Sequence, residues 1–484
     1  MDAAAGSGSS SSPSPSPLRI VLCPWLAFGH MLPYLELAER LALRGHRVSF
    51  VSTPRNLARL PSLRPAAAAR VELVALPLPH VDGLPDGAES TNSVSGVALE
   101  LLWKAFDGLG APFKEFLLAA EELGERPDWI LADTFNHWAA TVAGKHKVPC
   151  AMLLPTAALI ASWTPRTTGQ SVPVPGSVFE ESAGEAERPA NEPRYEWERR
   201  ARLYAKLPSS GMSIAERCAL TLRNCTITAM RSCVEWEGEA FKIAPALLGK
   251  PVVPLGLLPP SPDSGRGASV NREHATVQWL DAQPARSVVY VALGSEVPLP
   301  VEQVHELALG LELAGARFLW ALRKPSGVSD GDILPPGFQD RTSNQGLVTM
   351  GWVPQISILS HAAVGAFLTH CGRNSLTEGF LFGHPLIMLP IVVDQGPNAR
   401  LMERKKVGLQ IPRDEDNGSF GHHDVANTIR AVMLEKEKRQ IFATNARRMQ
   451  EIVADQELHD RYVDEFVQQL RSYATDASSA PVEI

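Results

Sequence analysis

A polar turn between two apolar segments carries the strongest chemical signal in this 484-residue chain. In the stretch AAVGAFLTHCGRNSLTEGFLFG, residues 364–368 are predicted to form a buried strand, and a helix is expected from near Ser375. The first backbone N–H groups of a helix have no internal partner, and the helix dipole favours negative charge there. His370 and Asn374 add side-chain donors, and Glu378 lies one turn further on. Phosphate donors beside a carboxylate suit a nucleotide that carries a sugar.

A second pair of candidate groups lies in the first third of the chain. His30 follows a strand expected over residues 19–26 and stands at the entrance of the next helix. A neutral imidazole near pH 7 is suited to accept a proton from a hydroxyl group. Asp133 belongs to another expected strand, residues 128–134, where an aspartate could simply cap the following turn. Taken alone, a histidine at the start of a helix is more often only a surface or capping group.

The segment from Trp352 to Gln395 resembles the signature box of the plant family-1 UDP-sugar-dependent glycosyltransferases. The likeness extends over roughly residues 18–473, and PWLAFGHMLPYLELA is similar to the family segment that holds the catalytic histidine. One position of the box departs from the family pattern, because Arg373 stands where Trp is usual. The matching positions are Trp352, Pro354, Gln355, His361, Gly365, Phe367, Thr369, His370, Cys371, Gly372, Asn374, Ser375, Glu378, Gly379, Gly383, Pro385, Pro390, Asp394 and Gln395.

This resemblance implies that His30 removes the proton of the acceptor hydroxyl, while Asp133 holds and polarises the imidazole. His370 and the helix N-terminus would neutralise the charge on the leaving β-phosphate, so no metal and no cofactor besides the UDP-sugar co-substrate is expected. Trp352 would stack on uracil, and Glu378 would accept the ribose hydroxyls. The donor-binding set implied in full is Thr156, Ser295, Trp352, Val353, Gln355, His370, Gly372, Arg373, Asn374, Ser375, Glu378, Asp394 and Gln395.

The acceptor wall carries a weaker signal. We expect Phe28, Trp138 and Trp163 to line it, next to an irregular insertion over about residues 162–213 that is either a substrate-facing lid or surface decoration. Asp330 and Asp332 have a spacing that resembles a metal site. They lie in a turn-rich segment, which we interpret as a solvated loop.

Arg373 leaves two interpretations of the donor sugar open. Either its guanidinium points into solvent, or it pairs with a carboxylate at C6, as the Arg found here in some plant flavonoid glucuronosyltransferases suggests. SVVYVALGSEVPL and LPIVVDQGPNARL resemble the branch that extends the sugar of terpenoid or flavonoid glycosides, such as steviol-glycoside glucosyltransferases. We therefore expect inverting transfer from UDP-glucose to a hydroxyl on the sugar of a small lipophilic plant glycoside. The alternatives are a UDP-glucuronate-dependent transferase, a catalytically impaired UDP-sugar-binding protein, and a non-hydrolysing UDP-sugar epimerase.

Strands alternate with helices along the chain, which predicts an α/β protein with doubly wound parallel sheets. The resemblance implies the GT-B arrangement, in which two Rossmann-like domains face each other across a cleft. The expected boundaries are 1–17 for a disordered tail, 18–258 for the acceptor-binding domain, 259–274 for the linker, 275–459 for the UDP-sugar-binding domain, 460–473 for a helix returning to the first domain, and 474–484 for a second disordered tail.

Composition and motif content exclude several other functions. The net charge of −7 argues against a nucleic-acid partner. Scattered cysteines, the lack of a secretory leader, and the lack of about 18 consecutive apolar residues predict a cytoplasmic protein without a membrane span, which we expect to be a monomer. No G-x-G-x-x-G, P-loop or H-E-x-x-H motif occurs, which weakens the dehydrogenase, kinase and metalloprotease interpretations.

Overall fold

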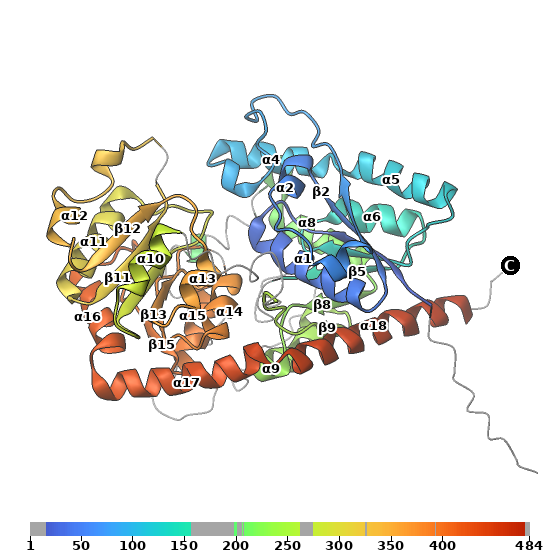
Figure 1. Ribbon diagram of the computed structural model, residues 1–484. Helices are drawn as coiled ribbons and strands as arrows, with labels where there is room; N and C mark the ends of the chain where they lie inside the picture. Colours follow the sequence, from blue (N-terminus) through green and yellow to red (C-terminus); the bar gives the residue numbers. More distant parts are fainter. Residues whose placement is uncertain are drawn as a thin grey trace, which may run out of the picture.

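The computed structural model describes residues 16–155, 198–200, 206, 208–261, 274–324, 327–392 and 394–479. Two parallel β-sheets surrounded by helices lie next to each other, and the last two helices run along one edge of both (Figure 1). The predicted pair of doubly wound parallel sheets is thus confirmed. The predictions for Thr156, Trp163 and most of the insertion and the linker fall outside the described residues.

The first sheet has seven parallel strands in the order β3-β2-β1-β4-β5-β8-β9. Because β1 lies between β2 and β4, the strand order changes direction beside β1, where open α/β sheets bind their ligands. Both faces of the sheet are buried: Val21 and Cys23 of β1 join one apolar cluster, and Ile20 and Leu22 join another. The strands are β1 (Arg19–Cys23), β2 (Arg47–Ser52), β3 (Val71–Ala75), β4 (Trp129–Asp133), β5 (Cys150–Leu154), β8 (Ile227–Met230) and β9 (Val252–Pro254), with a short hairpin of β6 (Pro208–Ser209) and β7 (Met212–Ser213) beside it.

The helices of this half differ from expectation at several points. His30 was expected at the entrance of the first helix, and it lies within the first turn of α1, whose N-cap residue is Ala27. Sequence patterning missed α6, α8 and α9, although Ser213 and Glu216 form a capping box that the sequence SIAE signals at the start of α8. The helices are α1 (Phe28–Leu43), α2 (Pro54–Ala58), α3 (Pro65–Ala68), α4 (Val97–Asp107), α5 (Gly110–Glu122), α6 (His137–Lys145), α8 (Ile214–Asn224) and α9 (Val234–Leu248).

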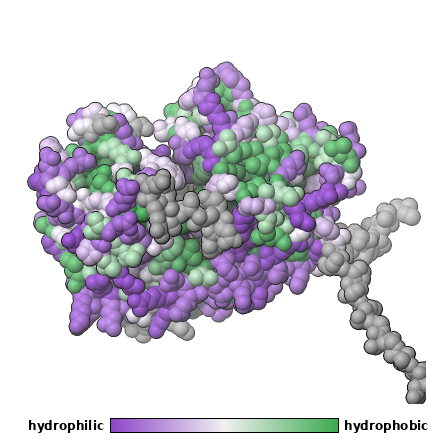
Figure 2. All heavy atoms as spheres, in the orientation of Figure 1, coloured by the Kyte–Doolittle hydropathy of each residue, from purple (hydrophilic) through white to green (hydrophobic). Residues whose placement is uncertain are grey.

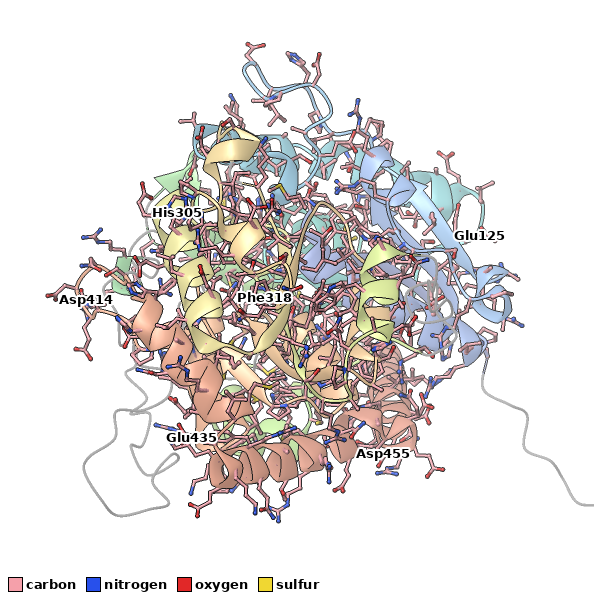
Figure 3. The ribbon with its side chains drawn as sticks, turned by 60° about the vertical axis from the view of Figure 1, so that its left-hand side comes forward. Glu125, His305, Phe318, Asp414, Glu435 and Asp455 are labelled. Atoms are coloured by element: carbon pink, nitrogen blue, oxygen red, sulfur yellow. The ribbon has the colours of Figure 1, made fainter. Side chains whose placement is uncertain are left out.

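The second sheet has six parallel strands in the order β12-β11-β10-β13-β14-β15, with its change of direction between β10 and β13. Phe318 of β11 is fully buried, whereas Glu435 and Asp455 lie on the outer edge near α17 (Figure 3). The strands are β10 (Val288–Ala292), β11 (Arg317–Leu322), β12 (Gly346–Met350), β13 (Val364–Thr369), β14 (Leu386–Met388) and β15 (Gly408–Gln410). The helices are α10 (Ala275–Asp281), α11 (Val301–Ala314), α12 (Phe338–Arg341), α13 (Gln355–Leu359), α14 (Arg373–Leu381), α15 (Gln395–Arg404), α16 (His422–Met433) and α17 (Lys436–Ala454).

The last helix, α18 (Gln456–Ser479), packs against the first sheet. Phe466 and Leu470 are fully buried in the same apolar cluster as Ile20, and the indole N–H of Trp129 donates to the Leu470 carbonyl at 3.0 Å. Hydrophilic side chains cover the outer surface over α17 and α18 (Figure 2). Within the described part of the chain, no helix combines the length and the apolar character needed to cross a membrane.

Candidate active site

A cleft of about 800 Å³ lies between the carboxyl ends of the two sheets. Phe28 and His30 line it from the N-terminal half. Every donor-binding residue expected from the sequence, apart from Thr156, lines it from the other half: Ser295, Trp352, Val353, Gln355, His370, Gly372, Arg373, Asn374, Ser375, Glu378, Asp394 and Gln395. The segment that resembles a donor-binding box therefore faces the candidate catalytic histidine.

His30 and Asp133 form a hydrogen-bonded pair at the change in strand order of the first sheet. His30 follows β1 and Asp133 ends β4, and because these strands are neighbours their carboxyl ends meet. The His30 Nδ1 atom lies 2.8 Å from the Asp133 Oδ2 atom, and the Asp133 side chain is fully buried. With Nδ1–H held by the carboxylate, Nε2 is left with the lone pair that accepts a proton.

The surroundings make His30 a stronger base than a free imidazole. Burial acts to lower the pKa of His30, but the charge and hydrogen bond of Asp133 act to raise it. The carboxylates of Glu296 and Asp394 add to the increase, so the pKa lies above its ordinary value. The neutral, proton-accepting form of His30 consequently becomes more abundant as the pH rises through that value.

The turn expected to bind phosphate is tightly packed around His370. Gly372 is the N-cap residue and α14 begins at Arg373, two residues before the expected start at Ser375. Burial lowers the pKa of His370 to about 4, so this side chain is neutral near pH 7 and has an N–H group to offer a ligand rather than a positive charge. A Cβ atom added at Gly294 or Gly372 would come within 2.7 Å or 2.5 Å of His370 Nε2, so both positions require glycine.

The part of the cleft expected to bind uridine has a prearranged polar contact. The Gln355 Nε2 atom donates to Glu378 Oε2 at 2.6 Å, and the Tyr290 hydroxyl donates to Gln355 Oε1 at 3.2 Å. The Trp352 side chain stands at the cleft wall and is 77% exposed, which excludes the alternative that it belongs to the core. An exposed indole face beside a carboxylate and an amide suits a base and its ribose.

Asp394 and Gln395 are held in place by groups at the start of α15. Gln395 Oε1 accepts hydrogen bonds from the backbone N–H groups of Ile391 and Val392 at 2.8 Å and 2.9 Å. Asn398, which sequence reasoning did not single out, donates to Asp394 Oδ2 at 3.1 Å and to the Cys371 carbonyl at 3.1 Å. Burial raises the pKa of Asp394, although its hydrogen bond to Asn398 and the nearby cations oppose the rise. Asn398 thus connects the expected sugar-binding carboxylate to the phosphate-binding turn.

Arg373 is buried, so the interpretation that its guanidinium points into solvent is wrong. The Arg373 Nη2 atom lies 2.8 Å from Glu237 Oε1 and 2.7 Å from Ser232 Oγ, both in the N-terminal half. Glu237 belongs to α9, one of the helices that patterning missed, so this partner of Arg373 could not be predicted from the sequence. The positive charge of Arg373 is compensated within the protein.

The acceptor wall agrees less well with expectation. Trp138 is a core residue, which corrects its assignment to the wall: its ring lies 5.4 Å from that of Phe106 and 5.3 Å from that of Phe113, away from the cleft. The cause is its place in the first turn of α6, which turns it toward α4 and α5. Phe28 does line the cleft, with the guanidinium of Arg59 lying 4.6 Å above its ring.

Several charged residues at the cleft were not predicted. Arg59 donates to Ser90 Oγ and Asn92 Oδ1 at 3.3 Å, and Asn92 also lines the cleft. Arg59 follows β2 and Asn92 follows β3, and this position beyond the carboxyl end of a strand is their sequence signal. Glu296, Arg323 and Lys324 are further charged residues that line the cleft and were not predicted.

Comparisons with known proteins identify the kind of molecule that this cleft belongs to. Residues 257–464 match the family model described as "UDP-glucoronosyl and UDP-glucosyl transferase". The chain is 39% identical to UDP-glycosyltransferase 91B1 of Arabidopsis thaliana, covering 94% of this chain and 97% of that protein. It is also 39% identical to UDP-glycosyltransferase 91D2 of Stevia rebaudiana (96% and 97% covered) and 33% identical to soyasaponin III rhamnosyltransferase of Glycine max (96% and 97% covered).

Solved structures show the same fold. Arabidopsis thaliana UGT89C1 complexed with UDP-L-rhamnose superposes with a TM-score of 0.72 at 25% identity, covering 94% of this chain and all of that one. Os79 from O. sativa, solved with U2F and trichothecene, gives a TM-score of 0.74 at 24% identity and covers 93% of this chain and all of that one. These similarities support the GT-B fold expected from the sequence.

Proposed function

Because the chain belongs to the family of plant UDP-glycosyltransferases, we propose that it transfers glucose from UDP-glucose to a sugar hydroxyl of a small lipophilic glycoside, with inversion at the anomeric carbon. The observation that carries this proposal is the His30–Asp133 pair, which faces the N-terminus of α14 across one cleft. One face of the cleft offers a base for a hydroxyl group, and the other offers donors for a diphosphate.

The geometry supports a single displacement. His30 Nε2 takes the proton of the acceptor hydroxyl as its oxygen forms a bond to the anomeric carbon, and the bond to the β-phosphate oxygen breaks on the opposite side. The electron pair leaves with UDP, whose growing charge meets the His370 N–H donor and the first N–H groups of α14. Attack and departure on opposite faces invert the configuration.

A neutral hexose fits the donor side better than a glucuronate. A C6 carboxylate that paired with Arg373 would have to displace Glu237, whose carboxylate already lies 2.8 Å from the guanidinium. It would also lie close to that second negative charge, which disfavours its ionised form. This supports UDP-glucose over UDP-glucuronate as the donor.

The relatives favour an acceptor that already carries a sugar. Soyasaponin III rhamnosyltransferase is named for transfer to a saponin, and saponins are glycosides. The cleft has the matching character, since Asn92 and Ser93 stand beside the apolar ring of Phe28. Polar groups next to an aromatic surface suit a glycoside, with hydroxyls at one end and a lipophilic body at the other.

The test is a matrix of donors and acceptors. UDP-glucose, UDP-glucuronate and UDP-L-rhamnose are each incubated with matched pairs of plant glycosides and their aglycones, and products are identified by mass spectrometry and by NMR of the new anomeric centre. We expect glucosylation of the glycosides with a β linkage formed from the α-linked donor. A preference for UDP-glucuronate, or for aglycones, would overturn the corresponding part of the proposal.

Two controls separate the rival functions. Incubating each UDP-sugar without acceptor reveals an epimerase by a change of sugar configuration. Calorimetric titration with UDP distinguishes a binding protein, which would bind UDP and transfer nothing across the whole panel.

A further inference from the structure

Two consecutive residues at the phosphate-binding end of α14 reach across to the N-terminal half. Arg373 contacts Ser232 and Glu237, and Asn374 donates through Nδ2 to the Gly29 carbonyl at 3.2 Å. Gly29 directly precedes His30. The start of the donor-side helix is therefore joined to the backbone that carries the candidate base and, at a second point, to the segment between β8 and α9.

The second point is a buried ion pair. The side chains of Arg373 and Glu237 are 4% and 3% exposed, and Nη2 of Arg373 also donates to the Arg231 carbonyl at 3.2 Å. The guanidinium lies 4.7 Å from the ring of Trp236, which is fully buried. An arginine packed on an aromatic ring and paired with a carboxylate has a strongly fixed position.

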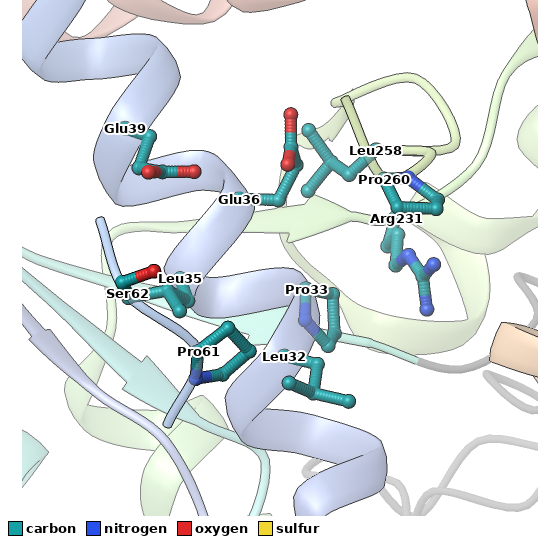
Figure 4. A pocket seen from close by; sticks show the side chains of 10 residues that line it. All are labelled: Leu32, Pro33, Leu35, Glu36, Glu39, Pro61, Ser62, Arg231, Leu258 and Pro260. Atoms are coloured by element: carbon teal, nitrogen blue, oxygen red, sulfur yellow. The ribbon is translucent and has the colours of Figure 1, made fainter. Parts of the chain in front are cut away.

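The backbone of α9 is bent where it supplies this carboxylate. Glu237 has φ −149° and ψ 51°, which is not helical, and its carboxylate accepts a hydrogen bond from the Ser232 hydroxyl. Arg231, one residue earlier, donates through Nε to the Leu257 carbonyl at 2.8 Å and through Nη1 to Asn374 Oδ1. It lies beside Leu258 and Pro260, opposite the start of α1 (Figure 4). The end of β8 thus holds both α14 residues and the chain that leaves the first domain.

A buried pair of this kind makes separation of the two halves unfavourable. Moving α14 away from α9 would leave the Glu237 carboxylate and the Arg373 guanidinium without their partners in a poorly solvated interface. Among the described residues, Nε and Nη1 of Arg373 have no hydrogen-bond acceptor, so the pair is incompletely satisfied and adds little net stability. Its main effect is to select one relative position of the two halves.

We propose that the Arg373–Glu237 pair is a cross-domain positioning contact that sets the distance between the α14 N-terminus and His30. This inference rests on the proposed transferase function. Arg373 is then a positioning residue that acts through α14. It does not recognise the charge of the donor sugar.

The test compares Arg373→Met, Glu237→Gln and the double variant with the unmodified protein. Each single change should lower kcat at least about tenfold, while the Kd for UDP stays within about threefold. The reason is that Arg373 and Glu237 contact Ser232 and each other, whereas uridine is expected at Trp352, Gln355 and Glu378. The double variant should be no slower than the slower single variant, because the two side chains act as one unit. Effects on kcat that multiply in the double variant would overturn the proposal.

A distance measurement gives a readout that a purely structural role would not change. Leu123 and Leu434 are 76% and 59% exposed, and all six native cysteines are buried, so Leu123→Cys and Leu434→Cys allow selective spin labelling. In the doubly labelled protein, Arg373→Met and Glu237→Gln should each broaden the distribution of distances between the two labels. An unchanged distribution combined with an unchanged kcat would rule out the positioning role.

The chain contains a matched control. Arg217 is fully buried, pairs with Asp107 at 3.0 Å, and lies 4.9 Å from the ring of Trp103, all within the N-terminal half. Asp107→Asn should lower Tm without broadening the label distances. If the unmodified protein transferred no sugar to any acceptor, the proposed function would fail; if it did and the variants behaved additively, only the positioning contact would fail.

Discussion

The two walls of the cleft are built in different ways. On the C-terminal wall, side chains hold one another before any ligand is considered, as in the pairs Gln355–Glu378 and Asp394–Asn398. These residues come from one continuous segment of the chain. The N-terminal wall has one strongly fixed pair, His30–Asp133, and its other groups come from separate segments that follow different strands. If the proposed function holds, we expect from this difference a donor site of fixed shape opposite an acceptor site that varies around His30.

Replacing the base should have the largest effect and should be confined to one wall. We expect His30→Ala to lower kcat by about 10²–10⁴-fold, the range for a positioned general base, and to leave the Kd for UDP nearly unchanged. Glu378→Gln is the opposite case and should weaken UDP binding with a smaller change in kcat. Loss of UDP affinity in His30→Ala would show that the two walls are not separable.

Removing the orienting carboxylate should produce the next largest effect. Asp133→Asn should reduce kcat by roughly 10²-fold or more, because the amide no longer favours the imidazolium form. Since Asp133 raises the pKa of His30, the variant should also shift the rising limb of the pH–rate profile to lower pH. A profile that keeps its midpoint would mean that another group controls the ionisation.

Replacing a glycine that packs against His370 should have a smaller effect, on UDP binding by the C-terminal wall. Gly294 has φ +82°, and a Cβ atom there would lie 2.7 Å from His370 Nε2, so Gly294→Ala should weaken UDP binding about tenfold, or by ~1.4 kcal/mol. Gly315 has φ +73° and nothing within 4 Å of an added Cβ atom. Gly315→Ala should therefore show only the backbone strain, about 1 kcal/mol in stability, with normal UDP binding. Equal UDP affinities in the two variants would contradict the packing argument.

The pKa values of the two cleft histidines should be shifted in opposite directions from that of a free imidazole. Proton NMR should place the pKa of His30 above 6.5 and that of His370 at about 4. The raised pKa of His30 contributes stability that is present below the unfolded value of about 6.5 and is lost as the pH rises through the folded value. The lowered pKa of His370 contributes stability above about 6.5 that is lost as the pH falls toward 4. Identical titration of both rings would remove the electrostatic contrast between the walls.

The sequence predicted best what local patterns encode. The alternation of strands and helices was sufficient for the two parallel sheets, and the small residues after residue 368 predicted the turn before α14. The adjacency of β1 and β4 then brings His30 to Asp133, although these residues are far apart in the chain.

The missed features depend on contacts between distant segments. Nothing near Arg373 in the sequence points to Glu237, whose orientation depends on a bend within α9. Trp138 was assigned to the wrong place because α6 was not predicted from the sequence. The orientation of this helix about its axis decides whether the Trp138 ring faces the cleft or the core. Arg59 could not be assigned to the cleft from the sequence, because its position there depends on its contact with the Phe28 ring.

The position of α18 has a consequence for how the protein is made. Phe466 and Leu470 complete an apolar cluster whose other members include Leu18 and Ile20, close to the start of the chain. During synthesis from the N-terminus, the part of this cluster that α18 covers stays exposed to water until α18 itself has left the ribosome. The core of the N-terminal half is therefore completed only when α18 has been made. Ending the chain before residue 456 should expose the apolar side chains of the N-terminal half that α18 covers.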